Sequence, residues 1–87
     1  MNANTLYSIY QTNREHGFHD LNFGLAQFKA DHPEVAISHE EDKAIREFIG
    51  RHGKKLADGF AKGPDAFAQV VSACEIEDAE GDREEAV

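Results

Sequence analysis

Histidines are the first residues whose type and spacing suggest chemistry, because imidazole is a common zinc ligand. The chain has five of them, and His16 and His19 are separated by only two residues, as in a pair of metal ligands. A zinc site would need further ligands, and the candidates are His32, His39, Asp20 and Cys74. Spacing alone is a weak signal, and His16 also suits the C-terminal end of a helix, where a cation is favoured. We therefore predict no metal site and keep a histidine-based metal-binding module as the third alternative for the function.

Residues for nucleophilic or phosphate chemistry lack the surroundings that such chemistry needs. The run from Gly50 to Lys55 resembles the end of a phosphate-binding loop, but Phe48 and Lys55 stand where that motif has Gly and Ser or Thr. Cys74 falls on an apolar helical stripe, where burial raises the pKa of a thiol and makes it unreactive. A helical domain of 87 residues also leaves little room for a substrate pocket of ~300 Å³. We expect no enzyme, no catalytic residue and no cofactor.

Charge is distributed in blocks along the chain. The net charge is −8, and residues 75–87 hold seven acidic residues against Arg83 alone. Such an acidic segment attracts a basic partner and raises the rate of association. We expect Glu77, Asp78 and Glu80 to take part in binding. The alternative is that the acidic segment only keeps the protein soluble.

A basic block precedes the acidic one. Residues 43–62 hold six basic residues against two acidic ones, and Arg51, Lys54 and Lys55 are the candidates for partner contacts. Such residues could neutralise phosphates, so the alternative function is a small nucleic-acid-binding regulator that uses residues 46–62. Two observations weigh against this alternative. The helix dipole favours cations near a helix C-terminus without any ligand, and a net charge of −8 repels nucleic acid.

Three aromatic residues, Tyr7, Phe18 and Phe23, fall outside the predicted apolar stripes or at their edges. At about 100° per residue, Phe23 lies roughly opposite the apolar face of its helix, whereas Phe18 falls in a turn. Aromatic side chains dominate interface energetics, so we take these three as partner-binding candidates. The alternative is that a helix in a small bundle buries two faces, so that these rings belong to the core.

The elements that must position these residues are helices, because the apolar residues recur at intervals of three and four and no segment alternates with a period of two. The first helix is predicted to begin near Asn4 or Thr5 and to end at Gly17, which suits the left-handed residue after a helix. The second is predicted to begin after Asp20 as its N-cap and to end before Pro33.

The third helix is predicted to be the longest and to run continuously over residues 39–61. Ser38 and Glu41 form a capping box at its start. Its apolar stripe consists of Ile45, Phe48, Ile49, His52, Leu56 and Phe60. The stripe passes through Gly50 and Gly53, each of which costs ~1 kcal/mol relative to alanine, so we expect a soft point at 50–53.

A fourth helix is predicted to follow Gly63-Pro64, with an apolar stripe that ends at Cys74. Together the elements predict an all-α fold, a small single-domain bundle of about four helices with one long third helix and an acidic C-terminal tail. We place the helical domain at residues 1–74. Residues 75–87 are predicted to be a disordered tail, because they have almost no apolar residue to bury.

Size, charge and the lack of catalytic motifs favour a small acidic protein-binding module. By analogy with small acidic helical proteins of phages and bacteria, we expect a stoichiometric inhibitor or modulator of a larger protein complex, such as one that handles nucleic acid. The chain has no apolar run of the ~20 residues that a membrane span needs, and no secretory signal at its start. A single cysteine is typical of a reducing compartment. We therefore expect a cytoplasmic protein whose partner is another protein.

Overall fold

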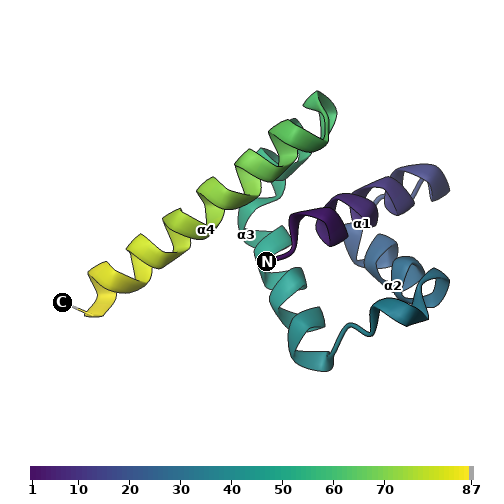
Figure 1. The fold of residues 1–87 in the computed structure, drawn as a ribbon, viewed down its shortest axis with the longest axis horizontal. Coiled ribbons are helices and arrows are strands. Elements are labelled where there is room, and N and C mark those ends of the chain that lie inside the picture. The colour runs from purple at the N-terminus through teal and green to yellow at the C-terminus, as the bar shows by residue number, and fades with distance from the viewer. Residues whose placement is uncertain (87) are drawn as a thin grey trace.

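Four α-helices and one short 3₁₀ turn make up the fold (Figure 1). The computed structural model describes the backbone of residues 1–86 and the side chains of residues 1–80. The elements are α1 (Ala3–His16), α2 (Leu21–Asp31), η1 (Pro33–Val35), α3 (His39–Lys62) and α4 (Pro64–Ala86). Within residues 1–86 there is no strand. This arrangement confirms the predicted all-α fold of about four helices with a long third helix.

Polar side chains cap the starts of the first three helices. Asn2, Asp20 and Ser38 each accept a hydrogen bond from a backbone N–H of the following turn, at 3.1, 2.9 and 3.1 Å. Such caps satisfy donors that have no partner within the helix. The caps at Asp20 and Ser38 are as predicted. The predicted capping box is only half formed, because the structure shows no hydrogen bond from the Ser38 N–H to the Glu41 carboxylate within residues 1–80. The predicted start near Asn4 or Thr5 is wrong by a few residues, because Asn2 provides the cap.

The helix ends also follow local signals. Gly17 closes α1 in the left-handed conformation, with φ of 67°, as predicted. Gly63, with φ of 121°, separates α3 from α4, which begins at Pro64. The sequence did not indicate η1, after which Ala36 adopts a left-handed conformation with φ of 53°.

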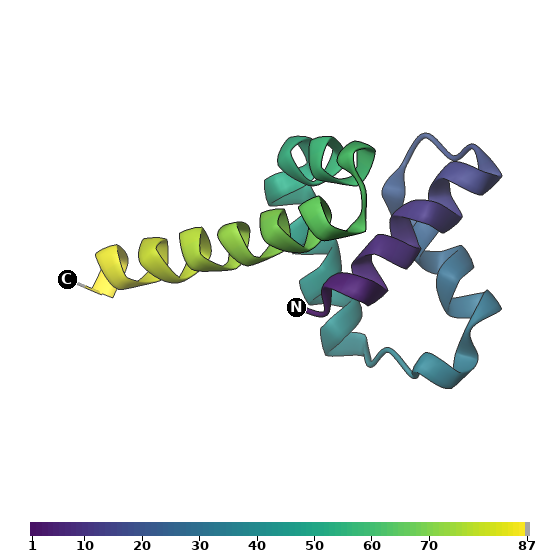
Figure 2. The same ribbon diagram turned by 45° about the horizontal axis from the view of Figure 1, so that its top comes forward.

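The helices pack mainly as two pairs, α1 with α2 and α3 with α4. Helix α1 also contacts α3 and α4, and thereby joins the two pairs. Both ribbon views show that α4 extends well past the rest of the molecule (Figures 1 and 2). The molecule is accordingly elongated, with extents of 43, 29 and 21 Å.

The core lies where α1, α3 and α4 meet and continues between α1 and α2. Its buried apolar residues are Leu6, Ile9, Tyr10, Leu25, Phe28, Ile45, Phe48, Ile49, Leu56, Phe67, Val71 and Cys74. All of them lie on the apolar stripes that the sequence predicts, which is why the helix faces could be assigned without the structure. No helix of the described residues has the combination of length and apolarity that a bilayer span requires.

Helix α3 bends at His52, whose φ of −117° and ψ of 18° are not helical. The prediction of a continuous helix is therefore wrong at this residue, although the bend lies inside the predicted soft point. Gly50 and Gly53 flank the bend, and glycine weakens a helix because it has the most backbone freedom to lose. The bent backbone leaves His52 buried between α3 and α4, with 6% of its surface exposed.

The predicted domain boundary after Cys74 does not coincide with a break in the backbone, since α4 continues to Ala86. Glu75, Glu77 and Asp78 pair with cationic groups of the body, so the first part of the acidic segment belongs to a packed helix. Disorder of residues 75–87 as a whole stays a prediction, and Val87 lies outside the described residues.

Candidate functional site

The C-terminal half of α3, which holds most of its basic residues, lies against the turn of α4 that contains Glu77 and Asp78. Arg51 lies 3.0 Å from Asp78, measured from guanidinium nitrogen to carboxylate oxygen, and Lys55 Nζ lies 2.7 Å from Glu77 Oε2. The sequence predicts these four residues as two separate sets of partner-binding candidates, and the structure brings them together. A partner that needs these side chains would have to compete with the internal ion pairs.

His52 adds a buried group to the same contact. Its Nε2 lies 2.9 Å from Asp78 Oδ1, and its ring packs against Phe48 at a centroid distance of 5.0 Å. An ionised carboxylate can only accept hydrogen bonds, so Nε2 carries the hydrogen of this bond. The sequence places His52 on the apolar stripe of α3 but does not indicate that an acidic residue of α4 covers it.

The pKa shifts of the acidic residues agree with this geometry. Partial burial of Asp78 alone would raise its pKa, but hydrogen bonds from Arg51 and His52 outweigh this effect and hold the pKa below its usual value. The hydrogen bond from Lys55 lowers the pKa of Glu77, and the same bond raises the pKa of Lys55. Each pair therefore stays charged over a wider pH range than isolated side chains would.

The other charged candidates are open to solvent. Lys54 is exposed on α3, and Glu80 is exposed on α4, one turn beyond Glu77. Beyond Glu80 the backbone of α4 continues for six residues, over which the sequence holds three further acidic residues and one arginine. Among the acidic candidates that the structure describes, Glu80 is therefore accessible without displacement of an internal ion pair.

The three aromatic candidates have different environments. Tyr7 is half-buried and packs against Phe60 and Phe67, at centroid distances of 4.9 and 5.5 Å, so its ring belongs to the core margin. Phe23 is 62% exposed, and the ring centroids of Phe18 and Phe23 lie 6.0 Å apart. Exposed Phe23 and half-buried Phe18 thus form a small aromatic patch at the turn between α1 and α2.

Besides His52, the side chains of Cys74 and Tyr10 are buried titratable groups. Burial raises the pKa of the Cys74 thiol, as the sequence predicts for a cysteine on an apolar stripe. Burial, together with the nearby Cys74, also raises the pKa of Tyr10 to about 12. Both groups are therefore uncharged at neutral pH, and neither is suited to nucleophilic chemistry.

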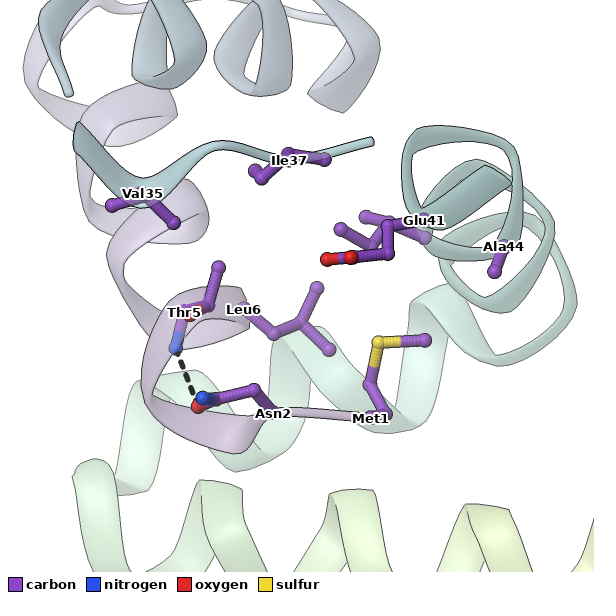
Figure 3. Close-up of a pocket in the computed structure, with 9 residues that line it drawn as sticks. Met1, Asn2, Thr5, Leu6, Val35, Ile37, Glu41 and Ala44 are labelled. Atoms are coloured by element: carbon purple, nitrogen blue, oxygen red, sulfur yellow. Dashed lines mark hydrogen bonds between the residues drawn. The ribbon is translucent and has the colours of Figure 1, made fainter. Parts of the chain in front are cut away.

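The predicted lack of room for a pocket is wrong. A cavity of about 440 Å³ opens between the start of α1, the segment after η1 and the first turns of α3 (Figure 3). Its walls are mostly apolar, and Glu41 lies at its edge.

Among residues 1–80, no three His, Cys, Asp or Glu side chains converge as a metal site would require. The ring of His16 stacks on that of Phe18, at a centroid distance of 5.3 Å.

Comparison with known protein families, with curated proteins and with solved structures finds no match to this chain.

Proposed function

We propose that the protein is a small acidic binding module that acts as a stoichiometric inhibitor or modulator by docking its acidic helix on a basic surface of a larger protein. The observation that carries this proposal is the projection of α4 beyond the body, because the projecting part is also the most acidic part of the chain (Figure 2). Complementary charge of this kind steers a partner and raises the association rate.

The charge density of the acidic segment points to the class of partner. Three acidic residues of this segment, Glu75, Glu77 and Asp78, are already paired with cationic groups of the body. Residues 80–85 hold four further acidic residues and Arg83, a net charge of −3, and six helical residues span about 9 Å. This gives one net negative charge per ~3 Å of helix axis, close to the one charge per ~3.4 Å along a single strand of DNA. A protein groove that normally holds a nucleic-acid strand would therefore meet a similar line of negative charge on the end of this helix.

Direct nucleic-acid binding by the basic half of α3 has less support. Of the three candidate cations, Arg51 and Lys55 are already paired with acidic residues of α4. A phosphate would have to displace those carboxylates and would also approach the acidic segment itself, which repels it. We therefore propose another protein as the partner. By analogy with small acidic helical proteins, we propose that this chain is of phage or bacterial type and cytoplasmic, as a single unpaired cysteine favours.

The test compares capture of a partner by the wild-type chain and by two charge variants. The tail variant carries the substitutions Glu80→Gln, Asp82→Asn, Glu84→Gln and Glu85→Gln. The control variant removes the same number of charges from exposed positions of the body, with Glu15→Gln, Glu40→Gln, Glu47→Gln and Asp58→Asn. Each tagged chain is incubated with a lysate of the source organism, and the captured proteins are eluted with salt or with duplex DNA and identified by mass spectrometry.

We expect the wild type and the control variant to capture the same protein in a stoichiometric complex, and the tail variant to lose most of it. Duplex DNA should displace the partner, because both compete for the same basic surface. Equal capture by both variants, or a partner that DNA does not displace, would contradict the proposal. A salt-sensitive gel shift of duplex DNA by the wild-type chain would instead favour the nucleic-acid alternative.

A further inference from the structure

Exposed apolar side chains line the cavity at the start of α1. Four large apolar residues are exposed among residues 1–80, and two of them, Met1 at 42% and Val35 at 41%, lie at this cavity. Leu6 and Ile45 of the core form its inner wall. A cavity of about 440 Å³ with such walls has the size and character of a binding pocket.

Glu41 supplies the polar group of this cavity. Figure 3 shows its carboxylate directed from α3 across the opening toward Leu6. Its neighbour Asp42 pairs with two cations, Lys29 and Arg46, at 2.8 and 2.6 Å. Within residues 1–80, no cationic group lies within ion-pair distance of Glu41, so its charge is available to a ligand.

The surrounding segment has the same sign of charge. Residues 31–42 contain five acidic residues and no lysine or arginine. Asp42 is neutralised by Lys29 and Arg46, and the ammonium of Met1, which lines the cavity, pairs with Glu75 at 3.4 Å, so the carboxylate of Glu41 remains for a ligand. This charge disfavours a second copy of the chain as the occupant, since the whole molecule is strongly negative, and it disfavours the acidic end of α4 for the same reason. Charge complementarity therefore selects an occupant that is apolar and carries a positive charge beside its apolar part.

We propose that this cavity receives an apolar side chain of the protein partner, with a lysine or arginine beside it that pairs with Glu41. This inference rests on the proposed function and adds a second contact to it. The acidic end of α4 provides long-range attraction, and the cavity provides the buried anchor that hot spots of protein interfaces require. Exposed Met1 and Val35 would become the apolar margin around that anchor.

The test uses the full chain, labelled with nitrogen-15, and a synthetic amphipathic peptide of leucine and lysine as the probe. Two further peptides of the same length replace every leucine by serine, or every lysine by glutamate. Amide shifts measured by NMR locate each peptide on the chain. We expect the leucine–lysine peptide to shift amides at Leu6, Ile37 and Ala44. The serine–lysine peptide should shift only amides of α4, and the leucine–glutamate peptide should bind nowhere.

Two matched pairs of variants test whether binding of the probe depends on the cavity or only on the overall charge of the chain. Ala44 lines the cavity and Ala57 does not, and both are exposed on α3. We expect Ala44→Phe to weaken the probe's affinity for the cavity at least tenfold, and Ala57→Phe to leave it unchanged. Glu41→Gln should weaken the affinity several-fold and reduce its salt dependence, whereas Glu40→Gln, with the same charge change outside the cavity, should not. Circular dichroism melts verify that each variant is folded.

The two proposals fail in different ways. If the leucine–lysine peptide shifts only residues 75–80, or if the two phenylalanine variants behave alike, the cavity is not a docking site and the proposed function is unaffected. If the peptide occupies the cavity as expected while the tail variant captures its partner as well as the wild type does, the proposed function fails and the cavity site stands.

Discussion

Replacing glycine by alanine is expected to change the free energy of unfolding in opposite directions at two positions of the same helix. Gly50 and Gly59 both lie in α3, but their surroundings differ. An ideal Cβ at residue 50 would meet no atom within 4 Å, whereas at residue 59 it would lie 2.9 Å from Val70 Cγ2 and 3.4 Å from Phe67 Cα. The helix preference for alanine is the same at both positions, so the difference isolates packing.

At position 50 only the helix preference acts. Alanine is favoured over glycine in a helix interior by ~0.5–1 kcal/mol, mainly because glycine gains more freedom on unfolding. For a domain of 60–100 residues, 1 kcal/mol corresponds to a change in melting temperature of about 4–8 °C. Gly50→Ala should therefore raise the melting temperature by ~2–8 °C.

At position 59 the clash with α4 outweighs the same gain. A distance of 2.9 Å between two methyl carbons is too short, so Val70 or the whole of α4 must move away. Overpacking of this kind costs ~1–3 kcal/mol, so Gly59→Ala should destabilise the protein on balance. Val70→Ala removes the atoms that clash, so the double variant should lose less stability than the two single losses added together.

The measurement is thermal and urea unfolding of the four proteins, followed by circular dichroism. The packing argument would be refuted if Gly50→Ala lowered the melting temperature. It would also be refuted if Gly59→Ala lowered the free energy of unfolding equally with and without Val70→Ala. Gly50→Ala also tests whether the bent part of α3 contacts a partner. A variant that is more stable but captures the partner less well would identify Gly50 and Gly53 as part of the interface.

Three further outcomes follow from the core, the acidic helix and the ion pairs. Phe48→Ala should lower the free energy of unfolding by ~3–5 kcal/mol in urea denaturation, because it leaves a cavity in the core. Truncation after residue 80 should leave the melting temperature nearly unchanged, whereas truncation after residue 74 should lower it, since buried His52 then loses its partner. Hydrogen bonds from two cations lower the pKa of Asp42, so its contribution to stability is present above the unfolded pKa of about 3.9 and is lost as the pH falls through the lower folded pKa. Asp42→Asn should therefore flatten the stability profile below pH ~4, as measured by unfolding across a pH series.

Local signals in the sequence were enough to predict most of the fold. The caps at Asp20 and Ser38 and the stops at Gly17 and Gly63 depend on residues within one turn of the helix end. The core faces could be read from the spacing of apolar residues for the same reason. The start of α1 was misplaced because Asn2 and Asn4 are equally good capping residues by type, and nothing local chooses between them.

The pairing of the charged blocks depends on how α3 folds back along α4. Arg51 lies twelve residues before Gly63, and Asp78 lies fourteen residues after Pro64. A turn at Gly63-Pro64 therefore brings the two side chains to similar positions along the paired helices. This near symmetry is a signal that the sequence contains, but it could be recognised only once both helices were known to be long. Gly50 and Gly53 indicated a soft point at the bend, but not the non-helical conformation of His52 itself. The cavity beside Glu41 depends on packing between α1 and α3, which are distant in sequence, and no local pattern predicts it.

The composition of α4 supports the proposed binding function, because it works against the stability of the helix itself. The residues that face the core, Phe67, Val71 and Cys74, are followed in the same helical register by Asp78 and then by Asp82, so the apolar stripe ends where the helix leaves the body. Acidic residues near a helix C-terminus are also unfavourable, because that end of the helix dipole is already negative. Neither packing nor the dipole therefore favours an acidic extension of about two turns beyond the internal ion pairs. A basic partner surface would remove both penalties, since its cations neutralise the carboxylates and the negative end of the helix together.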